Sequence, residues 1–300
     1  MPAHFIRVCD LDQEALYALF DQAQTLEDAF RGRSLPQALR GKRIALLFED
    51  GGFRNRVAFD LGVRLMGGEA VFVPGRPGEK EPAHDMARYL SNWFDGIIVR
   101  TPNYTVMEEI AQAAGVPVIN ARTSHNHPCE ILGDLAFVRK ERGNIDGLKI
   151  VVVGEAANLC HSWFEAAACL PLEVVQVCPP GYEVDSGFQA SMRRNAVGKL
   201  SVSHDLEAAL RGADVVYTDC WPRRSDMQAR ETVSRAFSPY RITAELLGRT
   251  PDTCMFLPCP PVTRGEEVST DAMTSSKCRV YEAKAYLLHA QNALLSTLVT

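Results

Sequence analysis

The sequence predicts an α/β protein with two doubly wound parallel-sheet (Rossmann-like) domains, joined by a linking helix and closed by a C-terminal helix. The first observation is that short apolar runs alternate with amphipathic stretches, the rhythm of a parallel sheet covered by helices on both faces. The second is that this rhythm restarts after one long helical stretch near the middle of the chain. The third is size, because 300 residues, 46% of them hydrophobic, fit two domains of ordinary length.

The first domain is predicted to span residues 1–137. Its strands are expected within 43–48, 69–74, 96–101 and 116–121, and its helices within 56–68, 84–94 and 105–115. The βα turns of such a sheet open along one edge, which is where these folds bind ligands.

The linking helix is expected at 127–143, where basic residues precede Gly143 as they do at many helix C-termini. The second domain is predicted to span 148–272. Its strands are expected within 148–156, 172–180, 213–221 and 253–262. The amphipathic segment 278–300 is predicted to be a packing helix that returns to the first domain.

Charge and cysteine usage exclude several classes of function. A net charge of -5 and a pI near 5.8, with acids and bases mixed along the chain, argue against nucleic-acid and membrane partners. The first twenty residues do not have the pattern of a signal peptide. The nine cysteines have no C-x-x-C pair, which favours reduced thiols in the cytoplasm. We therefore expect a cytoplasmic protein with small-molecule ligands.

The segment FEDGGFRNR places two glycines and two arginines where a strand gives way to a helix. Gly51 and Gly52 allow a sharp turn, and Arg54 and Arg56 follow at the start of the helix. Helix N–H groups and guanidinium groups together suit a phosphate or carboxylate. On this segment alone, a glycine turn with solvated arginines explains the pattern equally well.

Four more chemically capable side chains occupy equivalent topological positions. Arg100 ends the strand GIIVR, and His127 begins the linking helix. Asp219 and Cys259 end two strands of the second domain. These positions lie along the edges where parallel sheets bind ligands, which favours the functional interpretation of Arg54 as well.

The order of these segments resembles the aspartate/ornithine carbamoyltransferase family, and its ornithine branch in particular. The segment VPVINARTSHNHPCEILGDLAFVRKERG is similar to that family's His-Pro-x-Gln segment and linking helix. LKIVVVGEAANLCHS and GADVVYTDCW resemble the start and a central strand of the ornithine-side domain. PCPPVTRGEEV stands where the ornithine branch has His-Cys-Leu-Pro, and LLHAQNALL resembles the closing helix. The resemblance covers nearly the whole chain.

The resemblance implies a reaction without a metal, a cofactor or a covalent intermediate, in which an amine attacks carbamoyl phosphate bound between the two domains. By this resemblance, Arg54 and Arg100 would hold the phosphate and the carbonyl oxygen, and His127 would donate to that oxygen. Asn158 and Asp219 would hold the amino acid, with Cys259 beside the reacting amine. The resemblance also implies a homotrimer whose sites borrow a loop from a neighbour, with residues 74–85 as the candidate loop.

Departures from the family pattern affect the donor side first. Ser-Thr-Arg-Thr is replaced by Gly52, Phe53, Arg54 and Asn55, so three hydroxyls are lost. The Gln of His-Pro-x-Gln is Glu130, which adds a negative charge near a dianion, and the closing-helix arginine aligns with Leu287. Each lost charge-assisted bond would cost roughly 1.5 to 3 kcal/mol of binding free energy.

The acceptor side departs as well. After Asp219 the family's x-x-x-Ser-Met-Gly is replaced by a loop that contains Arg223 and Arg224. His-Cys-Leu-Pro has become Pro258, Cys259, Pro260 and Pro261. Two arginines in an acceptor loop suit a ligand with an additional carboxylate or phosphate, although a solvated loop explains them nearly as well.

Two other functions were considered and rejected. VVVGEAAN follows a strand, but it has one glycine where a dinucleotide fingerprint needs three. His125, His127 and Cys129 alternate as metal ligands can, yet the carbamoyltransferase resemblance accounts for the last two, so no metal site is expected.

The sequence thus predicts a divergent carbamoyltransferase that acts on an ornithine-like or more acidic amino acid. Its catalytic residues would be Arg54, Arg100, His127, Asp219 and Cys259. Its donor would contact Gly52, Phe53, Asn55 and Glu130 in addition, and its acceptor Asn158, Arg223 and Arg224. The alternative is a trimer that has lost catalysis and only binds small anions or amino acids.

Overall fold

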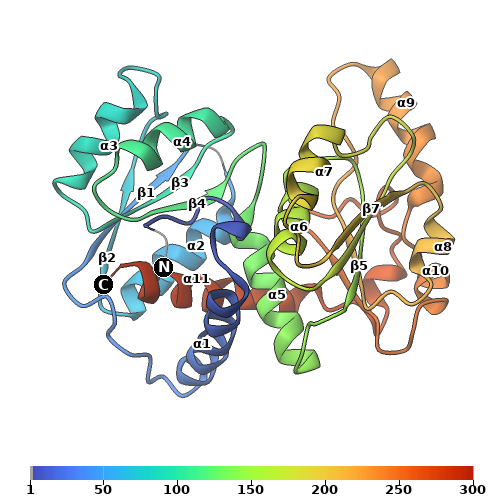
Figure 1. Cartoon of the computed structure of the whole chain (residues 1–300), viewed down its shortest axis with the longest axis horizontal. Helices are drawn as coiled ribbons and strands as arrows, with labels where there is room; N and C mark the ends of the chain where they lie inside the picture. Colours follow the sequence, from blue (N-terminus) through green and yellow to red (C-terminus); the bar gives the residue numbers. More distant parts are fainter. Residues whose placement is uncertain (1–2, 50, 300) are drawn as a thin grey trace. The chain divides into compact units, whose positions relative to one another are not determined.

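The computed structural model describes residues 3–49 and 51–299, and these form two compact units. One unit comprises Met1–Asn144 with Ala283–Thr300, and the other comprises Ile145–Glu282. Each unit is built around one fully parallel sheet with helices on both faces (Figure 1). The predicted fold class is therefore confirmed.

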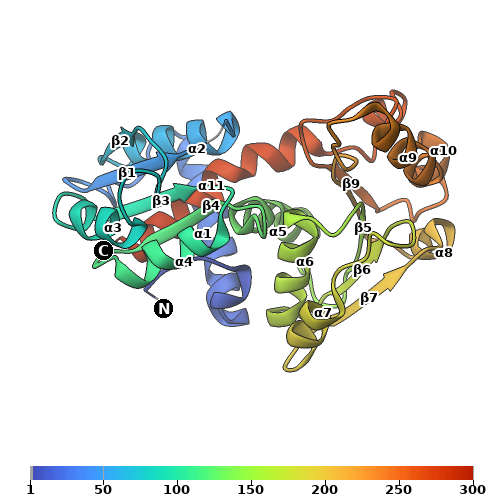
Figure 2. The same cartoon turned by 90° about the horizontal axis from the view of Figure 1, so that it is seen from above.

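The sheet of the first unit has the strand order β2-β1-β3-β4. Its strands are β1 (Arg43–Phe48), β2 (Glu69–Val73), β3 (Gly96–Arg100) and β4 (Val118–Arg122). Helices α3 (Ala83–Ser91) and α4 (Tyr104–Ala113) lie together on one face, and α2 (Phe53–Leu65) and α11 (Val280–Leu298) lie on the other (Figures 1 and 2). Apart from Arg100 at the end of β3, the buried residues of β1 and β3 are apolar on both faces, as expected for a covered parallel sheet.

Two further helices complete the first unit. Helix α5 (Pro128–Arg142) is almost wholly buried over its first eleven residues. Helix α1 (Gln13–Arg31) packs against it and is capped by Asp12, whose carboxylate accepts from the Ala15 N–H. Helix α1 was not among the predicted elements, although its buried residues recur mostly at three- and four-residue spacing, which is typical of a helix.

The sheet of the second unit has the strand order β7-β6-β5-β8-β9. The strands are β5 (Lys149–Val153), β6 (Glu173–Val177), β7 (Lys199–Ser203), β8 (Val215–Thr218) and β9 (Met255–Pro258). Strand β7 was not expected because, as an edge strand, it contains a single fully buried residue, Leu200.

The helices of the second unit are α6 (Asn158–Cys169), α7 (Ser186–Arg193), α8 (Leu206–Leu210), α9 (Met227–Phe237) and α10 (Ala244–Gly248). Among the described residues, none of the helices has the length and apolar content needed to cross a membrane. In both units, the loops that follow the strands bring the candidate site residues to the carboxyl edge of the sheet.

Candidate functional site

The loop between β1 and α2 brings Gly52 against Arg100. Gly52 has a positive φ of 66° and forms the N-cap of α2. A Cβ atom at this position would overlap the guanidinium of Arg100, which ends β3 and is only 9% exposed. The glycine therefore serves both the left-handed backbone and the close approach of the arginine.

Helix α2 begins at Phe53, so Phe53, Arg54 and Asn55 form its first turn. Its N-cap, Gly52, has no side chain, and within residues 3–49 and 51–299 no side-chain cap is bonded to the first N–H groups. Arg54 is half-buried, and its guanidinium lies 4.8 Å from the centroid of the Phe53 ring. Phe53 itself is 67% exposed, whereas Asn55 is 3% exposed and points into the unit. An uncapped helix start beside two arginines is an electrostatic setting for an anion.

His127 is a buried, neutral imidazole. Burial is the main reason that its pKa falls to about 3, and the cations Arg100, Arg122 and Lys284 lower it further. The Glu130 carboxylate opposes this shift and lies 3.5 Å from His127 Nε2. Arg122 pairs in register with Arg100 across β3 and β4. A neutral histidine among cations can serve as a hydrogen-bond donor to an oxygen anion without contributing charge of its own.

Glu130 is the centre of a buried polar network. Its Oε1 lies 2.8 Å from Lys284 Nζ, and its Oε2 accepts from Asn55 Nδ2 at 3.1 Å. Gln291 Nε2 in turn donates to Asn55 Oδ1 at 2.8 Å, and Lys284 Nζ also lies 2.7 Å from Asp134. These five side chains are between 0% and 9% exposed.

This network changes what is expected of the Glu130 charge, which the sequence suggested would oppose a bound dianion. Burial alone would raise its pKa, but the Lys284 ammonium, His127 and Asn55 lower it to about 2. The carboxylate is therefore ionised and paired, rather than an uncompensated charge. The Lys284 ammonium faces the carboxyl groups of both Glu130 and Asp134.

Leu287 occupies the place of the expected closing-helix arginine and lies in an apolar contact. It is 2% exposed, and its Cα would lie 3.2 Å from a Cβ added to Gly133 of α5. Lys284 precedes it by three residues and hence lies on the same face of α11, one turn away. The cation on this face of α11 is Lys284, which pairs with two carboxylates of α5.

In the second unit, Asp219 and Cys259 directly follow the neighbouring strands β8 and β9. The Cys259 N–H donates to Thr218 O at 2.8 Å, which places it beside the end of β8. Asp219 accepts from the Cys220 N–H at 2.7 Å and lies over Gly154, whose added Cβ would be 3.7 Å from Asp219 Cβ. Asn158 begins α6 and is 8% exposed.

Further carboxylates surround Asp219. Burial raises the pKa of Glu155, and the negative charge of Asp219 raises it further while Arg224 opposes the shift. Burial likewise raises the pKa of Glu267, with a smaller contribution from Asp219. A cluster of carboxylates in mutual repulsion favours a cationic ligand group, such as the ammonium of an amino acid.

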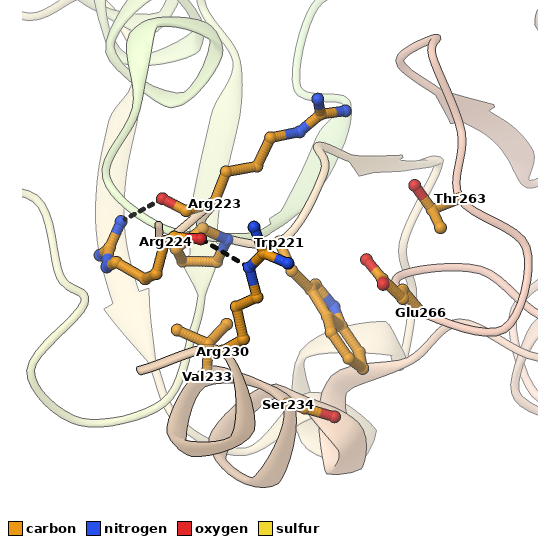
Figure 3. A pocket seen from close by; sticks show the side chains of 9 residues that line it. Trp221, Arg223, Arg224, Arg230, Val233, Ser234, Thr263 and Glu266 are labelled. Atoms are coloured by element: carbon orange, nitrogen blue, oxygen red, sulfur yellow. Dashed lines mark hydrogen bonds between the residues drawn. The ribbon is translucent and has the colours of Figure 1, made fainter. Parts of the chain in front are cut away.

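The loop after Asp219 presents arginines in different directions. The side chains of Arg223 and Arg224 diverge from the loop, and Arg230 of α9 extends past Trp221 (Figure 3). Arg224 Nη2 lies 3.7 Å from Glu155, whereas Arg230 Nε donates to Arg224 O at 2.7 Å. The two arginines predicted from the sequence therefore do not point at one common group.

His125 and Cys129, two of the alternating residues weighed as metal ligands, make other contacts in the structure. His125 stacks on Tyr104 with ring centroids 4.7 Å apart, and Cys129 Sγ donates to Asn120 O at 3.2 Å. Within residues 3–49 and 51–299, no group of three His, Cys, Asp or Glu side chains is arranged to hold a metal ion.

Four residues near these sites were not predicted from the sequence: Arg122, Glu155, Arg230 and Lys284. Arg122 and Glu155 each end or follow a strand, so the positional criterion used for Arg100 would have found them. Lys284 and Arg230 lie on helices, and their roles depend on packing that periodicity does not show.

Comparisons with known proteins agree across the whole chain. Residues 3–140 match the family described as "Aspartate/ornithine carbamoyltransferase, carbamoyl-P binding domain", and residues 146–298 match "Aspartate/ornithine carbamoyltransferase, Asp/Orn binding domain". The ornithine carbamoyltransferase of Geobacter metallireducens is 33% identical over the full length of both chains, and that of Desulfotalea psychrophila is 35% identical over 98% of both.

Solved structures give the same result. The ornithine carbamoyltransferase from Pyrococcus furiosus superposes with a TM-score of 0.93 at 30% identity, covering 97% of this chain and 95% of the other. The enzyme from Gloeobacter violaceus gives 0.87 at 31% identity, covering 100% and 99%.

Proposed function

Because this chain belongs to the aspartate/ornithine carbamoyltransferase family, we propose that it transfers a carbamoyl group from carbamoyl phosphate, or a similar donor, to an amino acid. The acceptor is an ornithine-like amino acid or a more acidic analogue of it. The amine nitrogen attacks the carbamoyl carbon directly, the bond to the phosphate oxygen breaks, and the amine loses a proton. The chemistry requires placement and charge stabilisation from the protein rather than a covalent intermediate.

The proposal for the donor rests on the cations of the first unit. Arg100 is held against the uncapped start of α2, and Arg54 lies in the first turn of that helix. His127 is neutral at physiological pH and is a donor for the oxyanion that develops on the carbonyl oxygen. This combination of guanidinium groups and helix N–H groups is the single observation that favours a phosphate-bearing donor.

The proposal for the acceptor rests on the second unit. Asp219, with Glu155 nearby, suits an ammonium group, and Asn158 at the start of α6 suits a carboxylate or an amide. Cys259 follows the adjacent strand and is assigned to the vicinity of the reacting amine.

Turnover and binding can be tested together. We expect calorimetry to detect binding of carbamoyl phosphate, and a colorimetric ureido assay to detect product with ornithine or an acidic diamino acid. Arg54→Ala and His127→Ala should abolish turnover while the far-ultraviolet circular dichroism spectrum stays unchanged. Arg56→Ala is the matched control, because Arg56 lies on the same helical turn but stacks on Phe72 at 4.0 Å. Normal turnover in Arg54→Ala would refute the assignment.

The alternative of lost catalysis draws on the same helix. The family hydroxyls are absent from the start of α2, and Leu287 replaces a cation. A protein that binds amino acids but gives no product with any donor would favour this alternative.

We also propose a homotrimer. The outer face of α2 carries an exposed apolar stripe at four-residue spacing, formed by Phe53, Val57, Leu61 and Leu65, with exposed fractions from 67% to 37%. Such a stripe is unusual on a surface that faces only water and suits a contact with a second copy. Light scattering should give the mass of three chains, and Leu61→Glu should reduce it. A monomeric wild-type protein would contradict the proposal.

A further inference from the structure

A pocket of about 300 Å³ lies between the segments that follow two adjacent strands, and its lining begins at Trp221, two residues after Asp219. One wall comes from the loop after β8 and from α9, and the other comes from the loop after β9. Because β8 and β9 pair in parallel register, both loops leave the same edge of the sheet as Asp219 and Cys259. The side chains that matter here are Trp221, Arg223, Arg224, Arg230, Thr263 and Glu266.

The pocket is cationic. Three of its charged side chains are arginines, and Glu266 is the acid that faces them across Trp221 (Figure 3). Arg224 extends in the opposite direction from Arg223 and lies near Glu155, so its charge is partly compensated outside the pocket. Arg223 and Arg230 therefore provide most of the positive potential that a ligand would meet.

The floor of this pocket is preorganised. Trp221 is 6% exposed and packs with Val233 and Phe237, with 6.1 Å between the ring centroids of Trp221 and Phe237. Arg230 donates its Nε hydrogen to Arg224 O at 2.7 Å, which orients the guanidinium and leaves its terminal nitrogens available for a ligand. A fixed guanidinium loses little entropy when it binds an anion.

We propose that this pocket binds a second anionic group of the acceptor, a carboxylate or phosphate beyond the α-carboxylate, between Arg223 and Arg230. The inference rests on the proposed function, since it names the substrate class of the same site. The ammonium of the acceptor lies with Asp219, and its extra anion lies with the arginines. Glu266 disfavours further negative charge, so one additional anionic group is the expected limit.

The experiment compares acceptors and variants. With carbamoyl phosphate as donor, rates are measured for ornithine, for 2,3-diaminosuccinate and 2,6-diaminopimelate, and for analogues in which a phosphonate replaces the second carboxylate. Arg223→Ser and Arg230→Met test the pocket. Arg235→Met is the matched control, because Arg235 is an exposed arginine of the same helix that does not line the pocket.

We expect the wild-type protein to prefer an acceptor with an extra anion. Each pocket variant should lower the ratio of kcat/KM for that acceptor to kcat/KM for ornithine by about 10- to 100-fold, mainly through KM. Arg235→Met should leave the ratio unchanged. The carboxylate and phosphonate series identify which anion is recognised. An equal effect of the pocket variants on ornithine and on the acidic acceptors would overturn the inference while leaving carbamoyl transfer intact.

Direct binding separates the two proposals. Succinate, titrated into the protein without donor, should bind more weakly to Arg223→Ser and Arg230→Met than to the wild type or Arg235→Met. If no acceptor is turned over but succinate binds in this arginine-dependent way, the proposed function fails and the anion pocket stands. If succinate binding is the same in all four proteins, the pocket is not an anion site.

Discussion

The two units set their distinctive polar residues in physically opposite environments. In the first unit, Asn55 and Glu130 are buried and bonded to each other, and Lys284 pairs with the Glu130 carboxylate. In the second unit, Arg223 and Arg230 are exposed, and Arg230 Nε donates to a main-chain oxygen, that of Arg224. Buried substitutions must be compensated together, because an unpaired buried charge costs several kcal/mol. Exposed substitutions can alter ligand preference at little cost in stability.

The largest expected effect is the loss of Lys284. Lys284→Met removes the ammonium that the Glu130 and Asp134 side chains share, in a site where the three side chains are at most 9% exposed. Breaking a buried ion pair by removing one partner typically costs about 3 to 5 kcal/mol of unfolding free energy. Urea denaturation at pH 7 measures the change.

The double variant sharpens this test. Lys284→Met combined with Glu130→Gln also removes the carboxylate charge at position 130. The double variant should therefore recover part of the stability that Lys284→Met alone loses. If the two substitutions were simply additive, the network would not be the coupled unit that its distances indicate.

The second effect concerns acid stability. Glu130 has a pKa of about 2 in the folded protein, below its ordinary value of 4.5, so it releases its proton more readily when folded. Its stabilisation is therefore fully present above about pH 4.5 and is lost as the pH falls towards 2. In denaturation curves between pH 5 and 2.5, Glu130→Gln should lose less stability than the wild type, and a parallel loss would contradict the assignment.

The fold class could be predicted from the sequence because the strands of a covered parallel sheet form short apolar runs. β1 and β3 were found at their observed positions because nearly every residue in them is buried. β7 was missed because an edge strand with one fully buried residue lacks that signal. The limit is physical, since periodicity reports burial and not pairing.

The candidate sites were predictable only in part for a related reason. Residues at the carboxyl ends of parallel strands lie along the same edge of a sheet. The positions of Arg100 and Asp219 at the edges of their sheets could therefore be predicted from the sequence. The partnership of Glu130 with Lys284 joins positions 154 residues apart and depends on how α11 packs on α5. Glu130 therefore looked like an uncompensated charge until the structure supplied its partner.

A third, intermediate effect is expected at Gly52. Gly52→Ala places a side chain in a left-handed conformation and forces it against the Arg100 guanidinium. The backbone strain costs about 1 to 3 kcal/mol of unfolding free energy, and the displaced arginine should weaken binding of carbamoyl phosphate as well. Gly51→Ala is the control, since a Cβ there meets no atom within 4 Å. Equal donor affinity in the two variants would show that the position of Arg100 does not matter for the donor.

The smallest expected effect on stability is at Arg223. Its side chain is exposed, and surface substitutions of this kind usually change the unfolding free energy by less than about 0.5 kcal/mol. Arg223→Ser should therefore unfold at the same urea concentration as the wild type, even though it is expected to change acceptor preference. Lys284→Met, measured in the same series, should show a large loss of stability. A destabilisation in Arg223→Ser as large as that in Lys284→Met would mean that the acceptor loop is structural. The exposed position in the second unit would then respond to substitution as the buried position in the first unit does.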